Sequence, residues 1–219
     1  MPGPYPPEFR QRALDLVRSG RGVVRLSTGG VMPEGDRERW NARYRGGDPP
    51  LFRVHPVVAK AFAHGFPAGV TADLACGASG SALRLAGTGR RVLAVDIAEA
   101  GLVLLDGEAR RRGLRSLLSP VQADLAGWPV QEQTLALVVC TGFWDRGVFA
   151  AAVRATAPGG LIAWEAFTTG IVTDRPSFPE RWCLRDGEPA ALLPPGFTVL
   201  EQEEVPGHRR QLIARNLVT

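Results

Sequence analysis

Three carboxylates stand at or near the ends of short apolar segments that alternate with helical patterns. Asp73 and Asp96 lie in the first two of these segments, and Asp124 directly follows the third. A carboxylate in these places can accept an amino-acid ammonium group, the two hydroxyls of a ribose, or the amino group of an adenine. The pattern therefore predicts a site for a cofactor that contains a nucleoside.

The first carboxylate precedes a turn of small residues, Ala75 to Gly80. Small residues let the backbone approach a ligand closely, and the helix that we expect next offers free N–H groups at its start. The turn nearly fits the dinucleotide fingerprint, with alanine in place of the first glycine. This motif alone does not distinguish a dinucleotide from another nucleoside cofactor.

Each carboxylate also has a purely structural interpretation. Asp73 could be bonded only to backbone amides, Asp96 could cap the helix that follows it, and Asp124 could be a turn former. Asp96 occupies a position used by both NAD and S-adenosylmethionine folds. Asp124 favours the second cofactor, because the dinucleotide fingerprint has no contact to the adenine amino group at that place.

The elements that must position these residues follow from the periodicity of apolar side chains. Five strands are expected, at 70–75, 91–97, 117–123, 135–140 and 161–167, with helices at 81–86, 98–112 and 146–156 between them. Helices at 33–44 and 56–64 precede the first strand, and a short helix is expected at 188–193. Strands that alternate with helices predict a parallel sheet with the ligand at the carboxyl ends of its strands.

Two further strands are expected at 197–204 and 211–217, and the link between them is short enough only for a hairpin. The predicted fold class is therefore α/β, a doubly wound and mostly parallel seven-stranded sheet with a C-terminal antiparallel hairpin.

Several motifs together resemble those of class I S-adenosylmethionine-dependent methyltransferases, especially the tellurite-resistance-methyltransferase group. They are Asp73-Leu-Ala-Cys-Gly77, Val95-Asp-Ile97, Gln122-Ala-Asp-Leu125 followed by Trp128-Pro129, and Ala157-Pro-Gly-Gly-Leu-Ile162. The resemblance spans about residues 39–215. It implies S-adenosylmethionine as cofactor, with contacts at Asp73, Ala75, Gly77, Asp96, Ile97, Asp124, Leu125 and Thr141, and we count Cys76 of the turn with them. Ser79 departs from the family, which usually has glycine there.

The acceptor of the methyl group is expected to be a small molecule. Trp40 and Tyr44 share one helix face, and in the resembling family this helix covers the cofactor; Trp144 follows the fourth strand, and His208 precedes the last. These four residues are the candidate substrate contacts, although all four could instead serve packing or solvation. No catalytic residue is assigned, because alignment of the acceptor with an activated methyl group needs no obligatory base.

The first 31 residues differ from the rest of the chain in composition. They are rich in proline, glycine and arginine, and residues 5–20 resemble the opening helix of insertion-sequence transposases. No second helix follows that could enter a DNA groove. We therefore expect a poorly ordered extension at 1–31 and a methyltransferase domain at 32–219.

Composition excludes several other classes of protein. Cys76, Cys140 and Cys183 lack metal-ligand spacing, as do the three histidines, so no metal site is predicted. No apolar run reaches the roughly 18 to 20 residues that cross a bilayer, and the first residues lack the apolar core of a signal peptide, which predicts a cytoplasmic protein without a membrane partner.

The net charge of +4 arises mainly in the first 31 residues, so no nucleic-acid partner is expected for the domain. The alternatives that remain are an NAD(P)-dependent oxidoreductase on a similar sheet, a non-catalytic cofactor-binding relative, and a DNA-binding remnant at residues 8–22.

Overall fold

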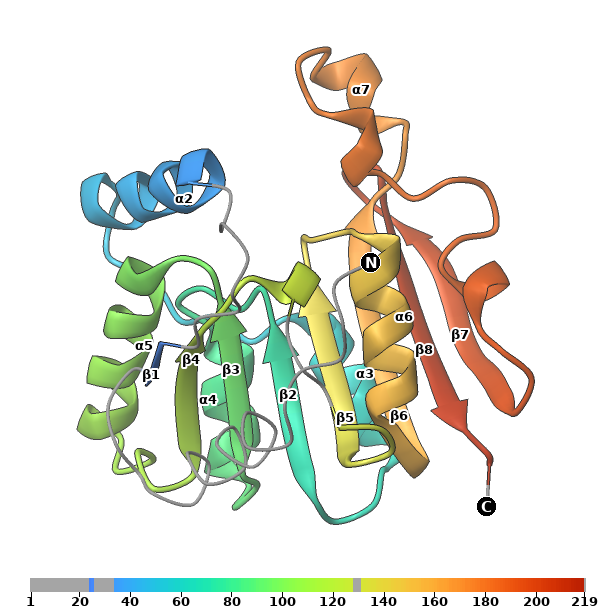
Figure 1. Ribbon diagram of the computed structural model, residues 1–219, viewed down its shortest axis with the longest axis horizontal. Helices are drawn as coiled ribbons and strands as arrows, with labels where there is room; N and C mark the ends of the chain where they lie inside the picture. The colour runs from blue at the N-terminus through green and yellow to red at the C-terminus, as the bar shows by residue number, and fades with distance from the viewer. Residues whose placement is uncertain (1–23, 26–33, 128–130, 219) are drawn as a thin grey trace. The chain divides into compact units, whose positions relative to one another are not determined.

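The structure is a computed structural model that describes residues 24–25, 34–127 and 131–218 (Figure 1). The chain divides into two compact units, and each is described by itself. The first unit comprises Met1–Val54 and Thr71–Gln131, and the second comprises His55–Val70 and Glu132–Thr219.

The first unit contains a parallel sheet with strand order β1-β4-β3-β2. Its strands are β1 (Val24–Arg25), β2 (Val70–Leu74), β3 (Val92–Asp96) and β4 (Leu118–Gln122). Its helices are α2 (Glu34–Gly46), α4 (Gly80–Gly87) and α5 (Glu99–Arg111), with a 3-10 turn η1 (Leu125–Gly127) after β4. Every residue of β3 and β4 is buried, as expected for strands covered on both faces.

The second unit has strand order β5-β6-β8-β7, in which β5 and β6 are parallel and β8 is antiparallel to both of its neighbours. Its strands are β5 (Leu135–Thr141), β6 (Thr156–Phe167), β7 (Phe197–Val205) and β8 (Arg209–Asn216). Its helices are α3 (Pro56–His64), α6 (Arg146–Ala155) and α7 (Ile171–Asp174), with 3-10 turns η2 (Glu180–Trp182) and η3 (Ala190–Leu192).

The predicted fold class is confirmed: the seven expected strands are present, mostly parallel, with an antiparallel pair at the C-terminal end. Some boundaries differ from expectation. β6 begins at Thr156 rather than at residue 161, and only the 3-10 turn η3 forms where a short helix was expected. The sequence pattern did not predict β1, whose Val24 lies in register with Val121 of β4.

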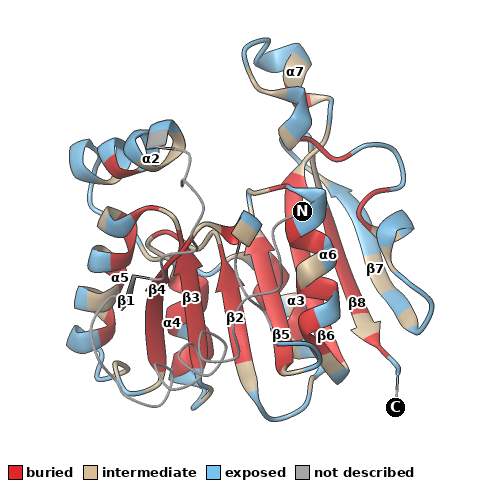
Figure 2. Ribbon diagram, in the orientation of Figure 1, coloured by how far each residue is buried: buried red, intermediate tan, exposed pale blue. Residues whose placement is uncertain are grey.

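Burial follows the apolar segments of the sequence. Figure 2 shows that β3 and β5 are almost entirely buried, whereas β7 is largely exposed. β7 carries Glu201, Glu203 and Glu204, and charged side chains on such a strand discourage pairing with a further chain. Each fully buried leucine or valine of the core stabilises the fold by about 1.5–3 kcal/mol.

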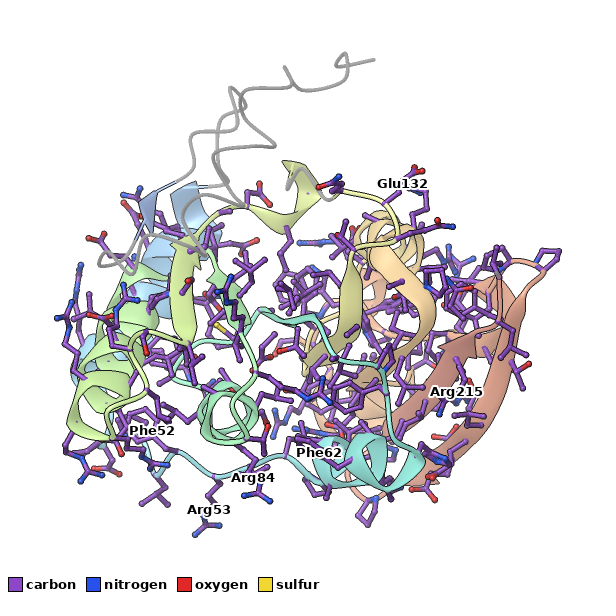
Figure 3. All side chains as sticks on the ribbon, turned by 90° about the horizontal axis from the view of Figure 1, so that it is seen from below. Phe52, Arg53, Phe62, Arg84, Glu132 and Arg215 are labelled. Atoms are coloured by element: carbon purple, nitrogen blue, oxygen red, sulfur yellow. The ribbon has the colours of Figure 1, made fainter. Side chains whose placement is uncertain are left out.

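Local sequence explains where several helices begin. The His55 side chain accepts a hydrogen bond from the Val57 amide, and Pro56 occupies the first position of α3. The Asp145 carboxylate accepts one from the Val148 amide at the start of α6. At the end of α3, the guanidinium of Arg215, labelled in Figure 3, donates to the carbonyl oxygens of His64 and Gly65.

A chain that starts at Met32 is expected to keep its melting temperature within a few degrees. The described part of the structure loses only the two residues of β1 in this truncation, and the glycine- and proline-rich remainder has few apolar side chains to offset the entropy of ordering it. Thermal unfolding of the full and truncated chains tests this expectation. A fall of many degrees would show that the first 31 residues dock on the domain.

Candidate cofactor site

The turn between β2 and α4 has an unusual backbone. Ala75 and Gly77 both have left-handed backbone angles, with φ of +51° and +52°. Such a conformation is strained for alanine and free of strain only for glycine. The Cys76 amide donates to the Val95 carbonyl of β3, 3.1 Å away, which fastens the turn to the neighbouring strand. The predicted small-residue turn is thus a tight loop at the carboxyl ends of two adjacent strands.

Asp96 at the end of β3 holds this turn in place. Its Oδ2 accepts a hydrogen bond from the Gly77 amide at 2.7 Å, and its Oδ1 accepts one from the Ala98 amide at 2.6 Å. The residue is 7% exposed. Burial raises the pKa of Asp96, while the backbone hydrogen bonds from Ala98 and Gly77 act in the opposite direction. Asp96 therefore organises both loops. It is not the N-cap of α5, because that position is Ala98, where no side-chain cap hydrogen bond forms.

Asp73 is 2% exposed and has a side-chain partner in the turn. The Ser79 hydroxyl donates to Asp73 Oδ2 at 2.5 Å and accepts a hydrogen bond from the Ala82 amide at 3.0 Å. Ser79 is thus both the N-cap of α4 and a partner of the buried carboxylate. This dual role gives a structural reason for serine where the resembling family usually has glycine.

Replacing Ser79 with alanine is expected to lower the free energy of unfolding by about 0.5–2 kcal/mol, because the cap of α4 is lost. The buried Asp73 carboxylate loses a hydrogen bond in the same variant. Urea denaturation measures the effect, and Ser177→Ala, at an exposed serine, is the control. An unfolding free energy equal to that of the control would contradict the role of Ser79.

Asp124 stands after β4 and forms a local turn. Its Oδ1 accepts a hydrogen bond from the Ala126 amide at 3.0 Å, as the turn-forming interpretation predicted, and Leu125 begins η1. The Ala123 amide donates to the Asp96 carbonyl, and Gln122 Nε2 donates to the Ile97 carbonyl. The loops that carry Ile97 and Asp124 are therefore joined by hydrogen bonds.

Helix α2 places Tyr44 over the turn. A Cβ added to Gly77 would lie 1.7 Å from Tyr44 Oη, and one added to Gly101 would lie 2.9 Å from Tyr44 Cε2. Burial and the nearby Asp96 raise the pKa of Tyr44 to about 12, so the phenol keeps its proton at neutral pH. Both glycines are needed for the ring to pack at this depth.

Asn41 is a site residue that the sequence reasoning missed. It is 5% exposed, and its Oδ1 accepts a hydrogen bond from the Ala100 amide at 2.8 Å, which holds α2 against the first turn of α5. The sequence feature that could have identified Asn41 is its position three residues before Tyr44 on the same helix.

Trp40, one of the predicted substrate contacts, is 37% exposed, and the guanidinium groups of Arg39 and Arg43 lie 5.7 and 5.4 Å from its ring.

The remaining predicted residues lie in the second unit. Thr141 ends β5, and the next residue, Gly142, donates its amide to the Glu165 carbonyl. Trp144 is only 2% exposed and packs against Phe149 and Trp164. Its burial favours packing over the predicted substrate contact, because the ring lies in the core rather than in an open loop.

His208 is exposed and lies in the tight link of the β7–β8 hairpin. Its φ is +54°, and its Nε2 lies 3.0 Å from Asp174 Oδ2. The ring also packs over the start of α7, since a Cβ at Gly170 would lie 2.5 Å from His208 Nδ1. The structure therefore shows a positioned histidine, and its role as a substrate contact stays a prediction.

Residues 72–160 match the family model Methyltransf_25, described as a methyltransferase domain. This segment contains the β2–α4 turn and the three predicted carboxylates. No curated protein sequence matches the chain significantly.

Solved structures resemble the chain over most of its length. TehB from Haemophilus influenzae is 19% identical, with 81% of this chain and 67% of that chain covered and a TM-score of 0.62. An S-adenosylmethionine-dependent methyltransferase from Clostridium acetobutylicum is 12% identical, with coverage of 83% and 98% and a TM-score of 0.60. Geranyl diphosphate C-methyltransferase from Streptomyces coelicolor, solved with S-adenosylhomocysteine, is 13% identical, with coverage of 99% and 100% and a TM-score of 0.61.

The fold is the Rossmann-like methyltransferase fold. The family model and these methyltransferase neighbours indicate S-adenosylmethionine as the cofactor. They favour the methyltransferase interpretation over the oxidoreductase one. The resemblance of residues 5–20 to a transposase helix finds no support in the comparisons, and those residues, like the whole predicted DNA-binding remnant at 8–22, lie outside the described part of the chain.

Two observations on the described residues concern a membrane-spanning helix and a metal site. No helix among them is long and apolar enough to cross a membrane. No group of three or more histidine, cysteine, aspartate or glutamate side chains among them could hold a metal ion. Cys140 and Cys183 are buried and Cys76 is half-buried, and these three described cysteines form no disulfide.

Proposed function

We propose that the protein is an S-adenosylmethionine-dependent methyltransferase that acts on a small-molecule acceptor. The observation that carries the proposal is the buried Asp96 carboxylate, which joins the glycine turn after β2 to the loop after β3. Each Asp96 oxygen accepts one backbone amide and has lone-pair capacity for a second donor. A ribose diol supplies two such donors.

We assign the rest of the cofactor to residues of the turn and of the loops after β3 and β4. The buried Asp73 would receive the ammonium group, and Asp124 would accept from the adenine amino group. The side chains of Ile97 and Leu125 would flank the base, while the backbone of Ala75, Cys76 and Gly77 would lie against the cofactor. The contact at Thr141 that the family resemblance implies stays a prediction. These assignments come from the family resemblance and agree with the burial of Asp73 and Asp96.

S-adenosylmethionine, when bound, supplies a methyl group that its sulfonium already activates. The residues of this chain therefore have to bind, orient and exclude water, and correct alignment alone can contribute about 7–11 kcal/mol to lowering the barrier. Tyr44 and the rest of α2 cover the turn and are proposed to shield it from solvent. No side chain is assigned as a general base.

Equilibrium binding distinguishes this function from its main rival. Calorimetric titration of the full chain with S-adenosylhomocysteine and, separately, with NADH should show binding of the first and none of the second. Binding of NADH alone would favour the oxidoreductase. A non-catalytic relative would bind S-adenosylhomocysteine yet transfer no labelled methyl group to any small thiol, hydroxyl, amine or chalcogen oxyanion.

A further inference from the structure

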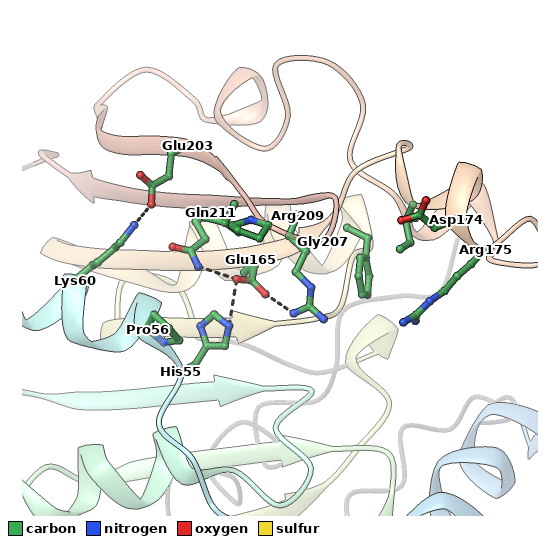
Figure 4. Close-up of a pocket in the computed structure, with 14 residues that line it drawn as sticks. His55, Pro56, Lys60, Glu165, Asp174, Arg175, Glu203, Gly207, Arg209 and Gln211 are labelled. Atoms are coloured by element: carbon green, nitrogen blue, oxygen red, sulfur yellow. Dashed lines mark hydrogen bonds and ion pairs between the residues drawn. The ribbon is translucent and has the colours of Figure 1, made fainter.

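The second unit contains a cavity of about 600 Å³ beside the β7–β8 hairpin (Figure 4). His208 does not line it, but the neighbouring Arg209, which the sequence pairs with His208, does. The wall of the cavity comes from the start of α3, the carboxyl end of β6, helix α7 and the β7–β8 hairpin. A volume of this size is typical of sites for small organic molecules. The residues that carry the argument are His55, Glu165, Phe167, Ile171, Arg209 and Gln211.

Glu165 is an ionised carboxylate at this cavity. It is 2% exposed, and its Oε1 accepts a hydrogen bond from Arg209 Nη1 at 2.7 Å. Its Oε2 lies 3.1 Å from His55 Nε2 and accepts a hydrogen bond from Gln211 Nε2 at 2.7 Å. Burial raises the pKa of Glu165, but the hydrogen bonds from His55, Gln211 and Arg209 outweigh it and lower the pKa to about 2. The carboxylate therefore fixes the orientation of three side chains around it.

One of those side chains has an unused polar atom. Gln211 is 5% exposed, and its Oε1 is buried without a hydrogen-bond partner among the described residues. The amide cannot turn over to relieve this, because its Nε2 must face Glu165, and Figure 4 shows the oxygen pointing away from that carboxylate. A buried acceptor left unpaired is unfavourable. A ligand N–H or O–H group would satisfy it.

Arg209 supplies the complementary donors. One nitrogen, Nη1, donates to Glu165, and the guanidinium carbon lies 4.4 Å from the centre of the Phe167 ring. A guanidinium has five N–H donors in a planar fork, so this single hydrogen bond leaves others for a carbonyl oxygen. Arg209 is about one-third exposed, and Ile171 adds an apolar side chain to the lining of the cavity.

The charges that line the cavity are balanced. Three cations, Lys60, Arg175 and Arg209, stand against three carboxylates, Glu165, Asp174 and Glu203. His55 lies beside Glu165, with its Nε2 3.1 Å from Glu165 Oε2. A charged ligand would bring a charge for which the lining has no surplus of the opposite sign, so a neutral ligand is favoured.

We propose that this cavity binds a neutral small molecule whose polar end donates a hydrogen bond to Gln211 and accepts one from Arg209. A primary amide and a hydroxyl next to a carbonyl have this pattern. An apolar or aromatic body would lie against Phe167 and Ile171. That such a molecule is the methyl acceptor rests on the function proposed above.

Three probes of similar size test the recognition: benzamide, which donates and accepts, acetophenone, which only accepts, and benzoate, which is an anion. Binding to the full chain without cofactor is followed by ligand-observed NMR titration. Benzamide is expected to bind about tenfold more tightly than acetophenone, because only benzamide pairs Gln211 Oε1. Equal affinities, tighter binding of benzoate, or no binding of benzamide would overturn the proposal.

Two pairs of variants locate the binding. Gln211→Met should reduce the affinity for benzamide to that for acetophenone, whereas Gln202→Met, at a glutamine whose Oε1 accepts from the Ala190 amide outside the cavity, should not. Val205→Trp should block the cavity and abolish binding of both neutral probes, and Val199→Trp, at an exposed valine of the same strand, is its control. If Gln211→Met does not fold, Val205→Trp decides the result. Unchanged binding in Val205→Trp would place the ligand elsewhere.

The cofactor is tested separately on the same proteins. If benzamide binds as expected and S-adenosylhomocysteine does not, the cavity assignment stands and the proposed function is wrong. If the protein methylates only charged acceptors, and Val205→Trp turns them over as the unsubstituted chain does, the cavity does not hold the methyl acceptor.

Discussion

Replacing Asp96 with alanine is expected to weaken the binding of S-adenosylhomocysteine by roughly ten- to a hundredfold, which corresponds to the loss of about 1.5–3 kcal/mol of charged hydrogen bonding to the ribose. The same change removes the acceptor of two backbone amides, those of Gly77 and Ala98. Calorimetric titration well below the melting temperature measures the affinity.

The controls separate binding from folding. Asp186→Ala removes an exposed carboxylate of the second unit and should leave both affinity and melting temperature unchanged. Asp96→Ala should also unfold at a lower temperature, since two amides lose their acceptor. An Asp96→Ala protein with an intact circular dichroism spectrum and unchanged affinity would reject the ribose assignment.

The second large effect concerns Gly77→Ala. The residue has a φ of +52°, and its added Cβ would lie 1.7 Å from Tyr44 Oη. A left-handed backbone costs an alanine about 1–2 kcal/mol, and the overlap adds about 1–3 kcal/mol unless α2 moves. Gly77→Ala is therefore expected to be strongly destabilised in urea denaturation and to bind S-adenosylhomocysteine poorly.

Gly89→Ala is the matched control for the backbone cost. Gly89 has a φ of +81° in the same unit, and no heavy atom of the described residues lies within 4 Å of its added Cβ. The free energy of unfolding of Gly89→Ala should therefore fall only by the cost of the left-handed backbone. In a Tyr44→Ala background, where the overlap is absent, Gly77→Ala should cost only about as much free energy of unfolding as Gly89→Ala. Equal destabilisation of Gly77→Ala and Gly89→Ala would show that Tyr44 does not pack on the turn.

The positions of the strands and of the cofactor turn could be predicted from the sequence because they depend on local signals. Apolar runs define the strands, and the small residues after Asp73 define the turn. The ends of elements were less well predicted. Thr156 belongs to β6 and not to the preceding helix, since the ends of helices and strands depend on hydrogen bonds to neighbours that a local pattern does not contain.

The sequence by itself determined the fold class, because alternating strands and helices have few ways to bury their apolar faces, and it placed the carboxylates at strand ends. Only the tertiary structure decided what each side chain contacts. The Tyr44 ring lies on Gly77 and Gly101. Glu165 binds His55, Arg209 and Gln211, although His55 is more than a hundred residues away from the other three in the chain. Such contacts depend on how whole elements pack, so no local spacing in the sequence could have shown that Trp144 is core or that Gln211 has an unpaired oxygen.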